Sequence, residues 1–438
     1  MNWGSVRSFV SGFPCTASCR PPRTTSVARV GNVYPEFTFP QVEGHVASIT
    51  FGWPGSPEAG VRASHSPRRK DDMKSLRPKF LIATLVLAMV AAACSGTGST
   101  QDGATTTTKG GGSGSLSADL LGVGASFPAP LYQEWIGEYT TSVQPGISIN
   151  YQSIGSGGGV EQFISQQTDF GASDAFLKDD EIKAAQDARG CDPIHIPTVF
   201  GAVSVAYNLE SVDSLTLSGP VLADIFLGNI SKWNDAAIQD LNPGVSLPDE
   251  DVIVAHRSDG SGTTSIFTTY LSSVSDAWKN GPGAGKEVEW PAPNSVGGEK
   301  NDGVTAQIQQ NPGAVGYIEL SYAIENGIPV AKMTNDDGNA IEPTLESTAA
   351  AADGIQIPDD LRFNILNVGG RGYPIAGATW LLAWKCGYDE NKAAALKDWI
   401  TWSLQSGDGL ARELLYSPLP DSLQEEALVK VALINSEG

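Results

Sequence analysis

The sequence RSDGSGT occupies residues 257–263 and joins an arginine, a carboxylate and a Gly/Ser turn directly to a predicted helix. Apolar residues recur at helical spacing in the segment that follows it. The backbone amides of Ser261 to Thr264 are therefore expected to be unpaired first-turn donors, and such a helix end attracts anions. Asp-Gly-Ser-Gly is also common turn chemistry, so an ordinary capped helix is the simpler alternative.

Short apolar runs alternate with helical patterns after residue 118. The predicted strands are residues 147–151, 199–207, 252–255, 314–318 and 379–384. The predicted helices are residues 132–141, 160–167, 263–272, 391–404 and 423–433. This alternation indicates an α/β architecture. With 438 residues and 41% apolar content, the chain is long enough for two or three domains with apolar cores.

Two further Gly/Ser turns lead from an extended segment toward a helix, GVGASFP at residues 122–128 and GSGGG at 155–159. Pro128 supports the first, because proline is favoured in a first helical turn. Three such turns suggest that several helix N-termini converge on one anion, as happens where strand ends meet in an open α/β sheet. A fourth segment, DFGASDA at residues 169–175, places Asp174 directly after a short apolar strand.

Asp174 is a candidate specificity residue for such an anion. Phosphate at neutral pH keeps at least one O–H that an ionised carboxylate can accept, whereas sulfate has no proton to donate. A carboxylate here would therefore reject a fully deprotonated anion by unpaired charge. The alternative is that Asp174 caps the helix that follows it.

The net charge of −21 is distributed unevenly along the chain. Residues 1–94 hold 11 Lys and Arg against 5 Asp and Glu, which leaves 17 basic and 44 acidic residues in the remainder. A strongly acidic body argues against a nucleic-acid partner, which would need a basic face. An anion site in this body would have to depend on local dipoles and one or two placed cations.

Residues 73–94 resemble a bacterial lipoprotein signal, because basic residues precede an apolar run that ends in small residues and Cys94. The pattern predicts lipid attachment at Cys94; plain cleavage is the alternative, since Ala91 stands where leucine is usual. Residues 95–117 are interpreted as a Gly/Ser/Thr-rich tether. Residues 1–72 are interpreted as an over-extended reading frame, with a genuine extension as the alternative.

Cys191 and Cys386 are the cysteines that follow Cys94. Two cysteines in an exported body invite a disulfide, and two separate buried thiols are the alternative. The segment GASDA at residues 171–175 superficially mimics the Gly-x-Ser-x-Gly nucleophile elbow, so an esterase or phosphatase is the alternative function from another class. Only His195 and His256 are present after residue 94, and no metal-ligand cluster is evident, which disfavours it.

These segments together resemble the extracytoplasmic phosphate-binding protein of the high-affinity phosphate ABC transporter, from about residue 122 to 421. The resemblance also includes YQSIGSGGGV at 151–160, FLGNISKWND at 226–235 and PGAVGY at 312–317.

The resemblance implies an α/β periplasmic-binding-protein fold, type II-like, with two domains, two crossover strands and an interdomain cleft. Domain 1 would comprise residues 118–199 plus 375–438, and domain 2 residues 200–374. The crossovers would lie near residues 198–200 and 373–375. Both Cys191 and Cys386 would fall in domain 1, which favours their pairing.

The resemblance further implies a phosphate site in which Asp174 accepts the ligand proton and Asp259 holds Arg257 in place. Its remaining members would be Ser126, the Phe127 amide, Ser156, Arg257, Ser261, Gly262 and Thr263. The chain departs from the usual pattern at Ser126, Gly157 and Phe176, where Thr, Ser and Pro are more frequent; none of these changes removes a needed donor.

The implied protein is a lipid-anchored, monomeric receptor outside the cell membrane, with no catalysis, cofactor or metal, that delivers inorganic phosphate to the transmembrane permease of an ABC transporter. A receptor for sulfate, molybdate or another oxyanion is the remaining alternative, and Asp174 argues against it.

Overall fold

The computed structural model describes residues 116–366 and 368–437. The segments 1–72 and 73–94, with Cys94, lie outside the described residues, as does all but the end of the predicted tether at 95–117. The described chain is mixed α/β, as the alternation of patterns predicts.

One nine-stranded sheet forms the centre of the fold, in the order β2-β1-β3-β11-β4-β8-β6-β7, with β12 also paired to β4. Its strands are β1 (Ala118–Gly124), β2 (Ile147–Ser153), β3 (Phe170–Ser173), β4 (Pro193–Tyr207), β6 (Ile253–Arg257), β7 (Ser295–Gly298), β8 (Ala314–Glu319), β11 (Ala376–Trp384) and β12 (Ser417–Pro418). A separate three-stranded sheet contains β5 (Thr216–Leu217), β9 (Lys332–Thr334) and β10 (Ala340–Ile341).

The large sheet has two parallel groups of strands joined by two long antiparallel strands. β1 is parallel to β2 and β3, and β6 is parallel to β7 and β8. Between them, β4 pairs with β11 along its first part and with β8 along its last part. All residues of β4 and β11 are buried, as their almost continuous apolar sequences require. We refer to β1–β3 with their helices as the first half, and to β6–β8 with theirs as the second half.

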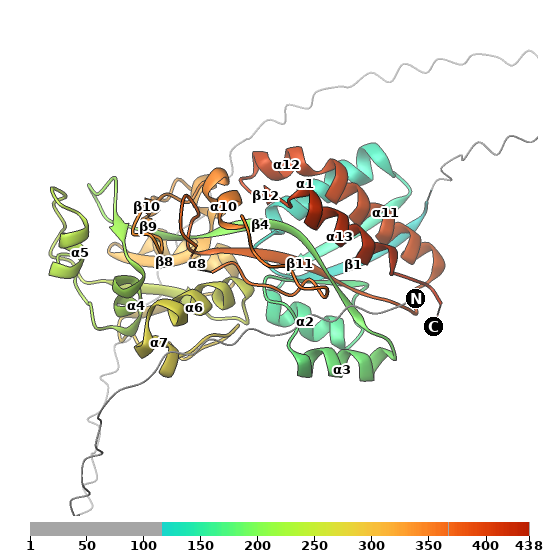
Figure 1. Ribbon diagram of the computed structural model, residues 1–438, viewed down its shortest axis with the longest axis horizontal. Helices are drawn as coiled ribbons and strands as arrows, with labels where there is room; N and C mark the ends of the chain where they lie inside the picture. Colours follow the sequence, from blue (N-terminus) through green and yellow to red (C-terminus); the bar gives the residue numbers. More distant parts are fainter. Residues whose placement is uncertain (1–115, 367, 438) are drawn as a thin grey trace, which may run out of the picture. The chain divides into compact units, whose positions relative to one another are not determined.

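The helices of the described residues are α1 (Ala129–Glu138), continued by a π-helix (Tyr139–Val143), α2 (Ser156–Ile164), α3 (Asp179–Arg189), α4 (Gly219–Leu227), α5 (Ala236–Leu241), α6 (Gly262–Val274), α7 (Asp276–Asn280), α8 (Lys300–Gln310), α9 (Leu320–Glu325), α10 (Leu345–Ala351), α11 (Glu390–Ser406), α12 (Asp408–Glu413) and α13 (Asp421–Ala432). In the first half, α1, α11, α12 and α13 lie on one side of the strands and α2 and α3 on the other (Figure 1).

The predicted strands and helices are all present, with shifted ends. The strand expected at residues 199–207 begins earlier, at Pro193, so the expected crossover at 198–200 falls inside β4. The helix expected at 160–167 begins at Ser156, because the glycines of the GSGGG turn form its first turn. Pro128 lies just before α1, and Pro130 occupies the first helical turn instead. The other expected crossover, 373–375, directly precedes β11.

The apolar interior of the first half is strongly aromatic. Tyr132 stacks on Trp135 with ring centroids 5.7 Å apart, and its hydroxyl hydrogen-bonds Thr198 at 2.8 Å. Trp399 of α11 packs against Phe170 of β3 at 5.0 Å. Buried rings of this size contribute large apolar areas, so they fix α1 and α11 against the strands that end at the site.

A disulfide joins Cys191, just before β4, to Cys386, just after β11, across 195 residues of sequence. It therefore ties the starting end of one long strand to the finishing end of the other.

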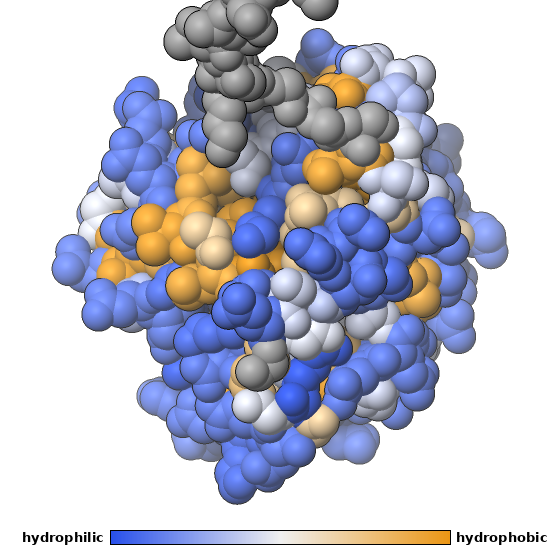
Figure 2. All heavy atoms as spheres, turned by 90° about the vertical axis from the view of Figure 1, so that its right-hand side faces the viewer, coloured by the Kyte–Doolittle hydropathy of each residue, from blue (hydrophilic) through white to orange (hydrophobic). Residues whose placement is uncertain are grey.

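Hydrophilic residues cover much of the end of the molecule that carries α3, α11 and α13, with apolar patches among them (Figure 2). Val429 and Leu433, at the exposed side of α13 and just after it, are 64% and 42% exposed. No helix among the described residues has the length and apolar character to cross a membrane.

Candidate functional site

The predicted site residues lie where strands of the two halves end and helices begin. Ser126 and Phe127 follow β1, Ser156 follows β2, and Asp174 follows β3. From the second half, Arg257 ends β6, and the residues 261–263 begin α6. The carboxyl ends of parallel strands meet at one edge of a sheet, which is where open α/β sheets bind ligands.

Glycines let the two halves approach very closely at this point. A Cβ atom on Gly262 would lie 2.5 Å from Ser156 Oγ and 2.6 Å from the Asp174 Cβ, so only glycine fits there. The Gly157 amide donates to the Gly260 carbonyl oxygen at 2.7 Å across the same contact. The GSGGG turn at residues 155–159 and the turn at residues 257–263 therefore pack directly against each other.

Arg257 is the central cation of this cluster, and its side chain is only 1% exposed. Its Nε and one terminal nitrogen donate to the two carboxylate oxygens of Asp259 at 2.7 and 2.5 Å. Asp259 also accepts the Lys300 amide at 2.9 Å. Burial alone would raise the pKa of Asp259, but the hydrogen bonds and charge of Arg257 outweigh it and hold that pKa below its ordinary value.

Asp174 is a buried carboxyl group, 4% exposed, on the side of the first half. Its Oδ1 accepts the Thr379 hydroxyl at 2.8 Å, and its Oδ2 lies 3.3 Å from the Ser156 hydroxyl. Burial raises its pKa to about 7, against the opposing effects of the Thr379 hydrogen bond and of Arg257. Asp174 does not cap α3, because Lys178 occupies the N-cap position of that helix.

The amides at the start of α6 differ in part from the sequence expectation. The Ser261 hydroxyl caps the helix by accepting the Thr264 amide at 3.0 Å, and the Ser261 amide donates to the Lys286 carbonyl at 2.9 Å. The prediction of four free amides is therefore wrong for Ser261 and Thr264, since a capping side chain and a neighbouring loop satisfy them. The amides of Gly262 and Thr263 remain as first-turn donors, and both residues are buried.

Two polar side chains at this site, those of Asn301 and Thr379, were not predicted from the sequence. Asn301, at the start of α8, contacts the Ser126 hydroxyl with both its backbone amide and its side-chain nitrogen, at 3.1 and 3.0 Å. Thr379 of β11 holds Asp174. Asn301 follows Gly297 and Gly298 at the end of β7, so it belongs to another turn from a strand to a helix, and that signal could have revealed it. Thr379 sits inside an apolar strand without any comparable signal.

The residues that suggested an esterase are engaged elsewhere. The Ser173 hydroxyl donates to the Ala175 carbonyl and is fully buried. His195 Nε2 accepts the Leu177 amide at 3.0 Å, and His256 Nδ1 contacts the Arg257 carbonyl at 2.9 Å. Neither imidazole is bonded to Ser173, so no histidine of the described residues is placed as the base that a serine nucleophile needs.

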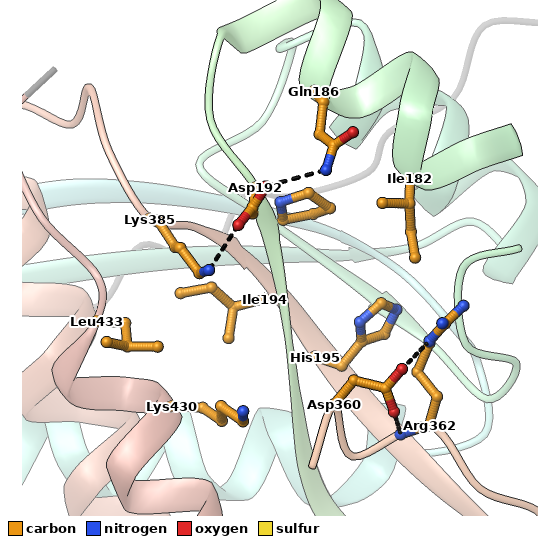
Figure 3. A pocket seen from close by; sticks show the side chains of 11 residues that line it. Ile182, Gln186, Asp192, Ile194, His195, Asp360, Arg362, Lys385, Lys430 and Leu433 are labelled. Atoms are coloured by element: carbon orange, nitrogen blue, oxygen red, sulfur yellow. Dashed lines mark hydrogen bonds and ion pairs between the residues drawn. The ribbon is translucent and has the colours of Figure 1, made fainter. Parts of the chain in front are cut away.

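A hollow of about 240 Å³ between α3, β4 and α13 contains none of the predicted phosphate-site residues (Figure 3). Its charges pair largely with one another: Lys385 contacts Asp192 at 2.6 Å, and Arg362 contacts Asp360 at 2.7 Å. Because these cations are already paired with carboxylates, the hollow is poorly suited to bind an anion. Within residues 116–366 and 368–437, no group of three His, Cys, Asp or Glu side chains is placed to hold a metal ion.

Comparison with known proteins assigns this chain to a family. The family model of the PBP superfamily domain matches residues 97–406. A phosphate-binding protein PstS of Xylella fastidiosa (strain 9a5c) is 41% identical over 335 residues, which are 75% of this chain and 89% of the relative. The chain belongs to the PstS family of phosphate-binding proteins. PstS of Pasteurella multocida (strain Pm70) is 39% identical, over 73% of this chain and 92% of the relative.

Solved structures agree with this family in fold. A high-affinity periplasmic phosphate-binding protein, PfluDING, bound with phosphate, matches with a TM-score of 0.60 at 21% identity, over 70% of this chain and 92% of that one. A putative phosphate ABC transporter substrate-binding protein from Clostridium perfringens, with bound phosphate, matches with a TM-score of 0.51 at 19% identity, over 69% of this chain and all of that one. The predicted periplasmic-binding-protein fold is thus confirmed. The PstS relatives are named as binding proteins and not as enzymes, in agreement with the predicted absence of catalysis.

Proposed function

We propose that this protein binds inorganic phosphate outside the cell membrane and delivers it to the permease of an ABC-type phosphate transporter. The observation that carries the proposal is the meeting of four strand ends around a set of buried donors and the buried carboxyl group of Asp174. In the described residues, Ser126, Ser156, Arg257 and Thr263 are each at most 4% exposed. A tetrahedral oxyanion has acceptor oxygens on all sides, which suits donors that approach from two halves of a protein.

The proposed ligand contacts are the hydroxyls of Ser126, Ser156, Ser261 and Thr263, the amides of Phe127, Gly262 and Thr263, and the guanidinium of Arg257. Asp259 fixes the guanidinium plane by its two hydrogen bonds, so that the remaining N–H groups are preorganised. Asp174 accepts the proton of phosphate. Sulfate has no such proton, so two negative charges would face each other at a buried carboxyl group.

The proposed mechanism uses two domains, residues 118–199 with 375–438 and residues 200–374, connected through β4 and the segment before β11. Contacts such as Gly157 to Gly260 join these domains directly, which supports the described conformation as the closed one. Capture would then be hinge closure around the anion, and release to the permease would need these contacts to open.

The proposal includes membrane attachment. Cys94, at the end of the predicted signal 73–94, would carry the lipid, and residues 95–117 would connect it to a monomeric binding protein. A lipid with at least two acyl chains on Cys94, followed by a flexible tether, would keep the protein close to its permease.

Calorimetric titration of residues 95–438 with phosphate and with sulfate, from pH 5 to pH 8.5, tests the ligand. We expect one phosphate per chain across this range and no sulfate binding at pH 8. Sulfate binding should increase as the pH falls through about 7, because a protonated Asp174 can donate to it. Equal affinity for both anions at pH 8, or no phosphate binding at any pH, would contradict the proposal. Hydrolysis of phosphate esters that Ser173→Ala abolishes would instead favour the enzyme.

A further inference from the structure

We infer that Asn301 is a positioning residue that forces the hydroxyl of Ser126 to act as a donor toward the bound oxyanion and favours donation by the hydroxyl of Thr263. This inference rests on the proposed function, because it concerns the same site. Asn301 is fully buried at the start of α8, in the second half, whereas Ser126 belongs to the first half. Its contacts therefore cross between the two halves.

The orientation of the Asn301 side-chain amide is fixed by its hydrogen bond to the backbone of Glu319. Its Oδ1 accepts the backbone amide of Glu319 at 3.0 Å, and a backbone N–H can only donate. The other atom of the side-chain amide is therefore the nitrogen, and it faces Ser126 Oγ at 3.0 Å and Thr263 Oγ1 at 3.4 Å. A flipped amide would place a carbonyl oxygen against the two hydroxyls and leave the Glu319 amide unpaired in the interior.

This orientation determines the direction of the hydroxyl hydrogens. A hydroxyl oxygen has two lone pairs and one hydrogen. Ser126 Oγ accepts from both the backbone and the side-chain nitrogen of Asn301, so both of its lone pairs are in use. The O–H that remains can only donate. Thr263 Oγ1 accepts the same side-chain nitrogen, which occupies one of its two lone pairs and favours donation by its O–H, a group that also hydrogen-bonds the Asp174 carboxylate.

The consequence is a site of defined polarity. Ser126 and Thr263 present donors, as do Arg257 and the amides of α6, while Asp174 presents the carboxyl oxygens. A buried hydroxyl that finds no acceptor is costly, so a ligand with acceptor oxygens at these positions is favoured. Asn301 thus contributes to selectivity without a direct contact to the ligand. It also links the halves, as does the Tyr322 hydroxyl, which donates to the Ser126 carbonyl at 2.6 Å.

The test is Asn301→Asp, which keeps the side-chain shape and the acceptor for Glu319 but replaces the nitrogen by an oxygen. The new carboxylate would accept the hydroxyl hydrogens and withdraw them from the ligand. We expect phosphate affinity at pH 8 to fall by about 100-fold. The loss should shrink toward pH 5, where a protonated Asp at 301 donates again. Asp174, Asp302 and Glu319 are present in both proteins, so the ratio of the two affinities at each pH isolates position 301.

Asn280→Asp is the matched control, because Asn280 is exposed at the end of α7, also in the second half, and the substitution adds the same charge. It should bind phosphate like the natural protein. A second measurement is the double-mutant cycle of Asn301→Ala with Ser126→Ala. If Asn301 acts through Ser126, the double variant should bind at least fivefold better than the product of the two single losses predicts.

The possible outcomes separate the two proposals. A natural protein that fails to bind phosphate overturns the proposed function. Natural binding with an unaffected Asn301→Asp variant, with a loss that is equal at pH 5 and pH 8, or with fully additive single losses overturns the role of Asn301 alone. Urea unfolding of each variant shows whether it is folded, and the cycle with Ser126→Ala still decides the matter if Asn301→Asp is not.

Discussion

Replacing Asp174 by asparagine should stabilise the ligand-free protein at alkaline pH while it removes the proton acceptor of the site. Burial raises the pKa of Asp174 from 3.8 to about 7. Because the folded pKa is the higher one, the folded protein holds this proton more tightly than the unfolded chain does. The contribution to stability is therefore fully present below pH 3.8, is lost as the pH rises toward 7, and stays lost above it.

The magnitude follows from the size of the shift. About three pKa units at about 1.4 kcal/mol each give a total near 4 kcal/mol, of which about 2–3 kcal/mol falls between pH 5 and pH 8. Asparagine can keep the acceptor for Thr379 and present its nitrogen toward Ser156, so the variant loses the charge without losing its partners. We expect the free energy of unfolding of Asp174→Asn, relative to that of the natural protein, to rise by about 2–3 kcal/mol between pH 5 and pH 8.

The assay is urea unfolding of phosphate-free protein at pH 5 and pH 8, compared between the natural protein and the variant. Glu319 titrates in both, so its contribution cancels in the difference. Asp119→Asn, at an exposed position of β1, is the control and should show no such pH-dependent gain. A variant that is less stable than the natural protein at pH 8, or a stability difference that is the same at both pH values, would refute the reasoning.

Three further predictions concern closure, a second buried acid and the disulfide. Gly262→Ala places a methyl group against the facing half, so calorimetry should show phosphate affinity reduced by about tenfold or more, whereas Gly137→Ala, which meets no atom within 4 Å, should bind normally. Burial raises the pKa of Glu319 to about 8, so the natural protein should lose stability as the pH rises from 4.5 to 8, and Glu319→Gln should flatten that profile in urea unfolding; an unchanged profile would contradict this assignment. Replacing Cys191 and Cys386 by serine should cost about 3–5 kcal/mol of unfolding free energy for a bridge spanning 195 residues, with phosphate affinity retained; a variant as stable as the natural protein would show that the bridge contributes nothing.

The sequence located five strands and five helices and indicated the α/β class, because each of these signals acts over a few residues; short elements such as β5 and α5 were not predicted, and the two-domain fold came from the family resemblance. Apolar runs located β4 and β11, and the segment 257–263 located the start of α6. Their ends shifted where the local signal was ambiguous: the glycines 157–159 suggested a turn, yet they form the first turn of α2. Glycine has a low helix propensity, but here its missing side chain allows contact with the facing half, and that tertiary contact decides.

The parts of the site that the sequence did not provide depend on pairs of residues far apart in the chain. Thr379 reaches Asp174 across 205 residues, and Asn301 reaches Ser126 across 175. No local pattern encodes such a pair, because each partner alone is an ordinary polar residue. The free first-turn amides were overcounted for a related reason: the partner of the Ser261 amide is the carbonyl of Lys286, in a loop whose position is fixed only by folding.

The same pairs explain how a strongly acidic body could hold an anion. Asp259 offsets the charge of Arg257, so the guanidinium adds directed donors rather than much net charge. The attraction must then come mainly from neutral amides and hydroxyls whose hydrogens are already oriented, in an interior where dipoles are poorly screened. Such a site is selective because its donors cannot reorient to suit another ligand. The polarity fixed by Asn301 and the proton required by Asp174 are therefore complementary parts of one preference, for an oxyanion that accepts at most positions and donates at one.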